Sequence, residues 1–220
     1  MSIAKTLEAR KSTRAFLDKA VPRAVIEKIL KSARHAPSGT NTQPWKVAVV
    51  SGEKRRALSD KIVAAFQSGQ PPQMDYHYYP QDWTEPYKTR RKECGLQLYQ
   101  TLSITREDKE RQKEQWLANY RAFEAPSVLF FFMDPVLEKG SFVDMGMFLQ
   151  SVMLMAVEEG LATCPQASLG EYPDIVRAEL GYGDEVLICG MALGYEDKEA
   201  VINSYRTPRL EVDAFTRFFE

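Results

Sequence analysis

Residues 127–133 read SVLFFFM, a continuous apolar run whose length suits a buried strand in the middle of a sheet. Two further runs, Trp45–Ser51 (WKVAVVS) and Glu185–Leu193 (EVLICGMAL), have the composition of strands and are each followed by a glycine. The segment Phe142–Glu159 is apolar nearly all round, which predicts a helix that is buried on every side. Together these segments predict an α+β fold with one mixed sheet wrapped by helices.

The remaining periodic segments predict further helices around this sheet. After Pro22, apolar residues recur at helical spacing up to Ala33, and this helix should end before Pro37. The other predicted helices are Ile3–Ala9, Glu53–Phe66, Pro86–Leu102, Arg106–Phe123 and Glu171–Leu180. The stretch Ser68–Glu85 is rich in Gln, Pro and Tyr and has no period, which predicts a long ordered loop of the kind that often binds ligands.

The composition argues against several classes of protein. The 29 Lys and Arg residues nearly balance the 30 Asp and Glu residues, so the basic surplus of a nucleic-acid-binding protein is missing. Three widely spaced cysteines and two histidines argue against a zinc site or a disulfide framework. The start of the chain is charged, unlike a signal peptide, and Met145–Val157 is too short to span a bilayer. We therefore expect one cytoplasmic domain over residues 1–220, with no metal, nucleic-acid or membrane partner.

Two basic segments at opposite ends of the chain are candidates for binding an anion. The segment Arg10–Phe16 (RKSTRAF) places three cations and two hydroxyl groups within five residues. Guanidinium groups bind phosphate through paired, charge-assisted hydrogen bonds, and a hydroxyl adds a further donor. The segment Tyr205–Arg209 (YRTPR) would complete a site for a dianion if the fold brings the two segments together. The alternative is that both are solvated surface cations.

Two loops of small polar residues are candidates for holding a flat polar ligand. Pro37–Trp45 (PSGTNTQPW) leads directly into a strand and would expose amides and hydroxyls to the edge of a heterocycle. Cys164–Gly170 (CPQASLG) permits close approach, and its Gln166 offers both a donor and an acceptor. Ordinary connecting turns have the same composition, so the residues alone leave both interpretations open.

The end of the chain stays apolar beyond the last predicted strand. The segment Tyr205–Glu220 carries Val212, Phe215, Phe218 and Phe219, among other residues. An apolar tail of this kind needs a surface to cover, and a second copy of the chain is a natural candidate.

The order and spacing of these segments resemble the FMN-dependent nitroreductase family. The R-x-S-x-R signature of that family stands here as Arg10, Ser12 and Arg14. Its other matching positions are Pro37, Ser38, Asn41, Gln43, Pro44 and Trp45, the small-residue loop, the G-x-A-x-G strand (Gly190, Ala192, Gly194) and the terminal R-x-P-R (Arg206, Pro208, Arg209). The first two signatures together are specific, and the resemblance extends over nearly the whole chain.

The resemblance implies a nitroreductase-like fold with a mixed, mostly antiparallel sheet. It also implies a homodimer with an FMN site at each side of the interface, in which residues from about 200 to 220 extend over the partner subunit. The implied reaction is ping-pong: NAD(P)H reduces FMN, and a nitroaromatic or quinone-like acceptor then takes the hydride or electrons. No side chain would need to act as acid or base, because flavin N5 carries the hydride.

The resemblance also assigns roles to individual residues. The terminal basic segments would hold the phosphate, with Arg14 near the flavin pyrimidine edge, while residues 37–41 would come from the other subunit and residues 165–168 would lie along one flavin face. The full set implied to bind the cofactor is Arg10, Lys11, Ser12, Arg14, Pro37, Ser38, Gly39, Asn41, Gln43, Pro165, Gln166, Ser168, Arg206 and Arg209.

The long loop Ser68–Glu85 resembles that of the subgroup that reduces nitrobenzoate-type compounds, and its aromatic rings would stack on an aromatic acceptor. The residues implied to bind substrate are Thr40, Tyr76, Tyr78 and Trp83. Many relatives carry a second cation at the pyrimidine edge, which is unassigned here, with Arg90 or Arg91 as candidates. The alternatives are reductive dehalogenation or azoline oxidation on the same flavin fold, a non-catalytic FMN-binding protein, and a nucleotide-binding module without flavin.

Overall fold

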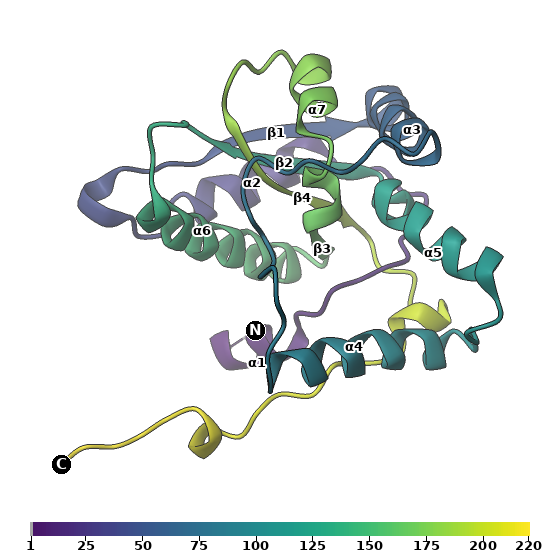
Figure 1. The fold of residues 1–220 in the computed structure, drawn as a ribbon. Coiled ribbons are helices and arrows are strands. Elements are labelled where there is room, and N and C mark those ends of the chain that lie inside the picture. Colours follow the sequence, from purple (N-terminus) through teal and green to yellow (C-terminus); the bar gives the residue numbers. More distant parts are fainter. Residues whose placement is uncertain (1) are drawn as a thin grey trace.

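The apolar run at residues 127–133 forms an interior strand of a four-stranded sheet in this computed structural model, which describes residues 2–220 (Figure 1). The order in the sheet is β1-β2-β4-β3, and all three pairings are antiparallel. In the described chain, the parallel contact is a single bridge between Ser12 and Thr163. The predicted α+β fold with a mostly antiparallel sheet is therefore confirmed. The strands are β1 (Lys46–Ser51), β2 (Ser127–Met133), β3 (Ala162–Gln166) and β4 (Val186–Gly194).

Strand β2 presents alternate side chains to two apolar layers, and helices cover both faces of the sheet. Phe130 and Phe132 belong to one layer, and Leu129 and Phe131 belong to the other. All of β2 is buried because neither face meets solvent, as its unbroken apolar sequence predicts. The first layer contains residues of α3 (Gly52–Gln67), α5 (Lys109–Tyr120) and α7 (Pro173–Leu180), and the second contains residues of α2 (Arg23–Ala33) and α6 (Lys139–Glu158).

The edge strand β3 has no counterpart among the predicted strands. It is five residues long and contains Pro165, which lacks the backbone donor that an interior strand would use. The neighbouring strand β4 approaches this region closely: a Cβ atom at Gly190 would lie 2.5 Å from Leu169 Cδ1. The glycine therefore lets the turn after β3 pack directly on β4.

Helix α6 differs from its sequence-based expectation. Its composition demands burial all round, yet Val143 is 65% exposed and most of its other apolar residues are only half-buried in the single chain. One face packs against the sheet and α2 through Phe148 and Val152. In the described part of the chain, α6 alone is long and apolar enough to cross a membrane, but a core helix meets the same criteria. The prediction of complete burial is wrong for one chain, because residues 2–220 leave the second face of α6 partly uncovered.

The long helical segments lie close to their predicted bounds. Helix α5 begins at Lys109 rather than Arg106, and the Asp108 carboxylate just before it accepts a hydrogen bond of 2.9 Å from the Thr105 backbone nitrogen in the preceding turn. It ends at Tyr120, and a left-handed turn of Ala122, Phe123 and Glu124 follows, with φ from 51° to 55°. The remaining helices are α1 (Ile3–Ala9) and α4 (Tyr87–Thr101).

The C-terminal tail leaves the body of the molecule, as its position in Figure 1 shows. It contains one short 3₁₀ turn, Val212–Ala214, and its large apolar residues are exposed. Phe218 and Phe219 are 81% and 88% exposed. The exposed apolar tail is thus present in the structure, while the surface that it covers stays a prediction.

Candidate functional site

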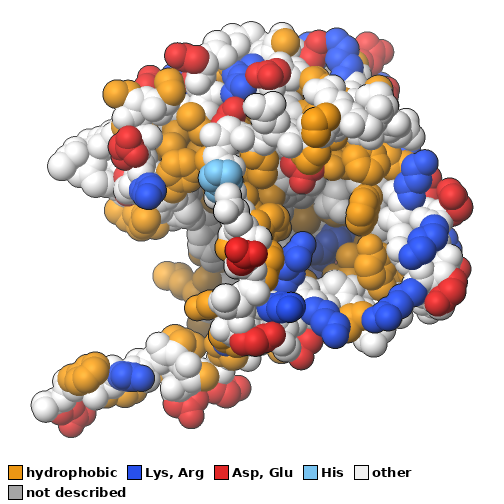
Figure 2. Space-filling view, viewed as in Figure 1, with side chains coloured by type: hydrophobic (Ala, Val, Ile, Leu, Met, Phe, Trp, Pro, Cys, Tyr) orange, Lys and Arg blue, Asp and Glu red, His pale blue; other side chains and the backbone are white. Residues whose placement is uncertain are grey.

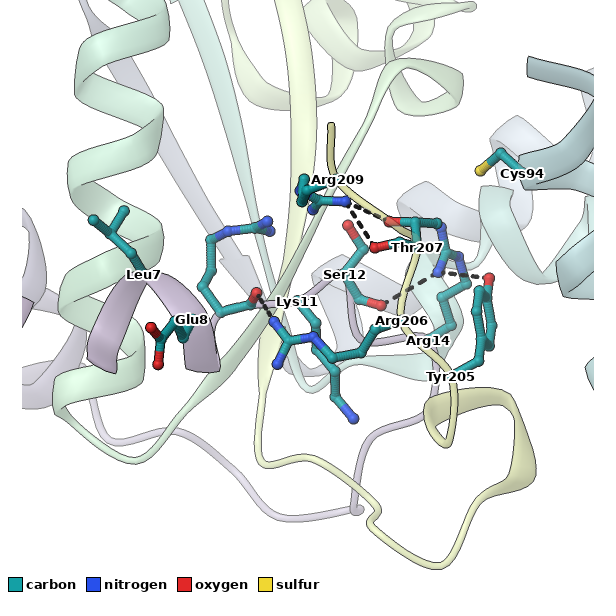
Figure 3. Close-up of a pocket in the computed structure, with 11 residues that line it drawn as sticks. Leu7, Glu8, Lys11, Ser12, Arg14, Cys94, Tyr205, Arg206, Thr207 and Arg209 are labelled. Carbon is teal, nitrogen blue, oxygen red and sulfur yellow. Dashed lines mark hydrogen bonds between the residues drawn. The ribbon is translucent and has the colours of Figure 1, made fainter. Parts of the chain in front are cut away.

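The two basic segments from opposite ends of the chain lie side by side. The Arg206 Nη2 atom donates a hydrogen bond of 2.6 Å to the Arg10 carbonyl oxygen, and Arg14 Nη1 lies 3.2 Å from the Tyr205 hydroxyl oxygen (Figure 3). With Ser12 these residues line a cavity of about 610 Å³, which we call the basic cavity. Figure 2 shows Lys and Arg side chains gathered in and around a hollow on this side of the molecule.

The guanidinium groups of the basic cavity have no acidic partner in the described part of the chain. No acidic side chain pairs with Arg10, Arg14, Arg206 or Arg209 anywhere in residues 2–220. Burial lowers the pKa of Arg10, and the positive charges of Arg209 and Arg206 lower it further. A cluster of like charges is unfavourable by itself and becomes favourable when an anion neutralises it. The geometry therefore fits a phosphate group better than it fits a set of solvated surface cations.

Asn203 holds the basic segment in place, and sequence reasoning missed it. Its Oδ1 atom accepts a hydrogen bond of 2.8 Å from the Arg14 backbone nitrogen, and its Nδ2 atom donates one of 2.9 Å to the Ala15 carbonyl oxygen. The residue is buried, and it lies in an unremarkable polar stretch of sequence. No signal in the sequence distinguishes it from a surface asparagine.

Lys11 differs from the arginines around it. Its Nζ atom lies 2.6 Å from a Glu196 carboxylate oxygen and donates a hydrogen bond of 2.5 Å to the Asn203 carbonyl oxygen. Its charge is therefore already compensated, although the residue lines the basic cavity. The structure thus separates Lys11 from the unpaired guanidinium groups.

A second cavity of about 720 Å³ adjoins the basic cavity, and Arg14 lines both. We call it the aromatic cavity, because rings make up much of its wall: Phe66, Tyr78, Tyr79, Trp116, Tyr120 and Tyr172. The residues Pro165, Gln166 and Ser168, predicted from the small-residue loop, form another part of the wall. A flat ring with polar edges suits a cavity of this composition.

Two buried polar atoms of this wall have no partner within the protein. The Gln166 Oε1 atom and the Ser168 hydroxyl are both unpaired, whereas Gln166 Nε2 donates a hydrogen bond of 2.8 Å to the Asn119 carbonyl oxygen. Unpaired buried polar groups are unfavourable unless a ligand or water satisfies them. These atoms therefore fit a ligand with hydrogen-bonding groups along its edge.

Glu171 and Tyr120 form a further part of the aromatic cavity that the sequence did not indicate. The Tyr120 hydroxyl donates a hydrogen bond of 2.5 Å to Glu171 Oε2. Burial raises the pKa of the Glu171 carboxyl, and the hydrogen bond from Tyr120 opposes that shift. The two residues are separated by 51 positions, so only the packing of α5 against the turn after β3 brings them together.

The loop Ser68–Glu85 lines the aromatic cavity through residues 69–72, Tyr78 and Tyr79, a different set from the one we expected. Tyr78 lines the aromatic cavity, but Tyr76 and Trp83 do not. The Tyr76 hydroxyl donates a hydrogen bond of 2.7 Å to the Ile188 carbonyl oxygen, and the Asp75 carboxylate accepts one of 2.6 Å from Arg177 Nη1. These contacts fix the middle of the loop to the end of the sheet, in agreement with an ordered loop.

Arg90 and Arg91, the candidates for a second cation, lie on α4 outside the aromatic cavity. The Arg91 guanidinium lies 5.0 Å from the Trp83 ring centroid, and the Arg90 guanidinium lies 5.7 Å from that of Tyr87. In a single chain, Arg14 is thus the cation of the aromatic cavity among the described residues.

The sequence profile described as the Nitroreductase family matches residues 7–195. The chain belongs to the nitroreductase family. Its relatives include a 4-nitrobenzoate reductase of Pseudomonas putida, 36% identical over 96% of this chain and 92% of the relative. A nitrobenzene nitroreductase of Ectopseudomonas oleovorans is 37% identical over 95% of this chain and 93% of the relative.

Solved structures of nitroreductases have the same fold over the full chain. The FMN and NADPH-dependent nitroreductase NfnB from Sphigopyxis sp. strain HMH superposes with a TM-score of 0.97 at 41% identity, covering 100% of both chains. The FMN-dependent nitroreductase NfnB from Mycobacterium smegmatis, solved in complex with NADPH, gives a TM-score of 0.94 at 34% identity, again covering 100% of both chains.

The second signature of this nitroreductase lies apart from both cavities of its own chain. The Ser38 Oγ atom accepts a hydrogen bond of 2.9 Å from the Gln43 backbone nitrogen, and the Gly39 nitrogen donates one of 3.2 Å to Asp144 on α6. Positive φ values at Thr40, Asn41 and Gln43 give the loop a tight form, and their side chains are exposed. None of Pro37–Gln43 lines either cavity in the single chain.

Cys164 lines the aromatic cavity, but its thiol is not a nucleophile. Burial raises its pKa to about 11, although Arg14 lowers it. Cys189 is buried in the apolar layer, where burial raises its pKa to about 12. Both therefore remain protonated near neutral pH and act as small core residues.

Proposed function

We propose that this chain is an FMN-dependent NAD(P)H nitroreductase that reduces nitroaromatic or quinone-like acceptors. The observation that carries the proposal is the uncompensated cluster of Arg10, Arg206 and Arg209 beside a cavity with unpaired polar atoms. Similarity over almost the whole chain to enzymes named for nitrobenzoate and nitrobenzene reduction supports the choice of acceptor.

The residues present fit FMN. Arg10, Ser12, Arg206 and Arg209 would hold the phosphate in the basic cavity, and Lys11 would lie beside it while remaining paired with Glu196. The flavin ring would lie in the adjoining aromatic cavity, where its edge would satisfy Gln166 Oε1 and the Ser168 hydroxyl, beside Pro165. Arg14 joins the cavities and would balance negative charge at the pyrimidine edge. FMN would supply hydride transfer, and the protein would bind and orient it.

The functional unit we propose is a homodimer of a single domain, residues 1–220. Three features of the chain support it: the exposed apolar tail, the uncovered face of α6, and the exposed Pro37–Gln43 loop that lies apart from its own cavities. In the dimer, the tail from about residue 200 would extend over the partner subunit. The set that would then complete the partner's site is Pro37, Ser38, Gly39, Asn41 and Gln43, with Thr40 near the acceptor.

Turnover would be ping-pong in one pocket: the nicotinamide cofactor reduces FMN and leaves, and the acceptor then binds. Tyr78 would stack on an aromatic acceptor from the loop, whereas Tyr76 and Trp83 would act by supporting that loop. We place the enzyme in the cytoplasm, consistent with the free thiol groups of Cys94, Cys164 and Cys189.

The visible absorbance of the purified protein tests this proposal. We expect a flavin spectrum that bleaches with NADH or NADPH under anaerobic conditions and returns when a nitroaromatic compound is added. Bleaching without reoxidation by nitro compounds or quinones would retain the cofactor and contradict the acceptor. A colourless protein that cannot be reconstituted with FMN would contradict the whole proposal.

A further inference from the structure

The wall of the aromatic cavity carries one acidic residue, Glu171, to which the cofactor contacts assign no role. Among residues 2–220, the polar side-chain partner of its carboxyl is the Tyr120 hydroxyl, at 2.5 Å. No Lys, Arg or His pairs with the Glu171 carboxyl in the part of the chain from residue 2 to residue 220. A carboxyl group in a ligand cavity without a cation to balance it is an unusual placement for a purely structural acid.

The surroundings of Glu171 favour its neutral form. The rings of Phe66, Trp116 and Tyr172 line the same cavity, and burial among them raises the pKa of the carboxyl. The hydrogen bond from Tyr120 stabilises the charged form and so limits the shift. Near neutral pH, more of Glu171 therefore keeps its proton than would be the case for a glutamate on the surface.

We propose that Glu171 is the proton donor for reduction of the bound acceptor, and that Tyr120 is a positioning residue that holds the carboxyl at the cavity wall. This inference rests on the proposed nitroreductase function. It replaces the expectation that no side chain acts as an acid.

The chemistry of nitro reduction requires such a donor. Conversion of a nitro group to a nitroso group takes up one hydride and one proton and releases one molecule of water. The hydride, which the reduced cofactor would supply, brings the electron pair that reduces the nitro group, and the proton from Glu171 goes to a nitro oxygen. One N–O bond then breaks, and that oxygen leaves as water with both the proton from Glu171 and the hydrogen that arrived as hydride. Glu171 remains as a carboxylate and recovers its proton from solvent. Ferricyanide, which accepts single electrons, takes up no proton.

The other titratable groups around the aromatic cavity are less suitable proton donors than Glu171. Burial raises the pKa of Tyr78, Tyr120, Tyr172 and Cys164, so these groups hold their protons more firmly than usual. The titratable side chains that line the aromatic cavity are Arg14, Tyr78, Tyr79, Tyr120, Cys164, Glu171 and Tyr172.

The first test compares two acceptors on the FMN-loaded enzyme. In Glu171→Gln, we expect the rate with a nitroaromatic to fall about 100-fold, a typical contribution of general acid catalysis, while the rate with ferricyanide stays unchanged. The matched control is Asp174→Asn, which removes a carboxylate three positions along the chain that is 92% exposed. It should leave both rates unchanged. An equal fall with both acceptors in Glu171→Gln, or no fall with either, would overturn the inference.

The second test follows the carboxyl itself and does not depend on turnover. The infrared band of a protonated carboxyl should disappear in Glu171→Gln, and in wild type it should titrate above the pH expected for exposed glutamate. In Tyr120→Phe, the titration and the fall of nitro reduction with rising pH should both move to higher pH, because the hydrogen bond that lowers the pKa is gone. Unmoved profiles would overturn the inference, whereas a wild-type enzyme that reduces neither acceptor would contradict the proposed function instead.

Discussion

The basic cavity and the aromatic cavity share Arg14 but differ in how they treat charge. The basic cavity concentrates guanidinium groups that have no acidic partner, so their mutual repulsion is relieved only by an anion. The aromatic cavity contains a single acid, Glu171, and burial raises the pKa of its carboxyl. The basic cavity is therefore suited to binding a ligand, and the aromatic cavity is suited to a reaction of a bound ligand. This difference can be tested by removing one element of each cavity at a time.

The largest expected effect concerns Arg10. In Arg10→Ala, FMN affinity should fall about 10- to 100-fold, since a hydrogen bond to a charged group contributes roughly 1.5–3 kcal/mol. Affinity for riboflavin, which lacks the phosphate, should stay unchanged because the aromatic cavity is intact. Fluorescence titration of the apoprotein measures both, with Lys54→Ala as the control, since Lys54 pairs with Glu179 outside both cavities. An equal loss for both flavins would contradict the phosphate assignment.

Gly190→Ala should disturb the aromatic cavity while leaving the basic cavity in place. The new Cβ atom would lie 2.5 Å from Leu169 Cδ1 and 2.7 Å from Leu169 Cβ, so the turn that carries Ser168 must move. We expect the free energy of unfolding to fall by about 1–3 kcal/mol, as for other overpacked cores. Riboflavin affinity should fall together with FMN affinity, in contrast to Arg10→Ala. Gly140→Ala, where the new Cβ atom meets nothing within 4 Å, is the control for denaturant unfolding.

The pH dependence of stability isolates the buried acid. Because the pKa of Glu171 is raised in the folded state, proton binding favours folding, and this contribution is lost as pH rises through the folded pKa. The melting temperature of Glu171→Gln minus that of wild type should therefore increase with pH over that range and then level off. A flat difference for Glu171→Gln would show that its carboxyl titrates as an exposed one does.

The smallest expected effect concerns Lys11. Its ammonium group is already paired with Glu196 at 2.6 Å, so Lys11→Ala should weaken FMN binding far less than Arg10→Ala does. Because the pair is partly exposed, its loss should lower the free energy of unfolding by no more than about 1 kcal/mol. Isothermal titration with FMN and denaturant unfolding measure the two effects. A loss of FMN affinity equal to that in Arg10→Ala would place Lys11 among the phosphate ligands.

Much of the fold could be predicted because the local sequence of most segments is enough to indicate whether they form a helix or a strand. The run at 127–133 is apolar at every position, and the helices around it have clear periodicity. Strand β3 could not be predicted in the same way, because it is short, contains Pro165 and exists only through its pairing with β4. The incomplete burial of α6 could not be predicted either. An apolar composition indicates that a helix will be buried, but it does not indicate whether the same chain or a second copy covers it.

The same distinction between local sequence and long-range contacts applies to the candidate site. The clustering of Arg10, Arg14 and Arg206 was foreseen from residue type, on the condition that the ends of the chain meet. Asn203 and the Glu171–Tyr120 pair were not, because each depends on contacts between distant segments and neither residue type is distinctive in its local sequence. Tyr76 was assigned to substrate binding for its ring, whereas its hydroxyl group is used in a hydrogen bond to β4.

The anchoring of the long loop has a consequence for engineering. Asp75 accepts hydrogen bonds from Arg177 and from the Leu187 backbone nitrogen, and the Tyr76 hydroxyl donates one to the Ile188 carbonyl oxygen. These contacts anchor the middle of the loop to β4. The residues that follow, 77–85, can then be treated as an exchangeable cassette between this fastening and α4. A combinatorial library confined to that cassette would explore new acceptor specificities while sparing the framework on which folding depends.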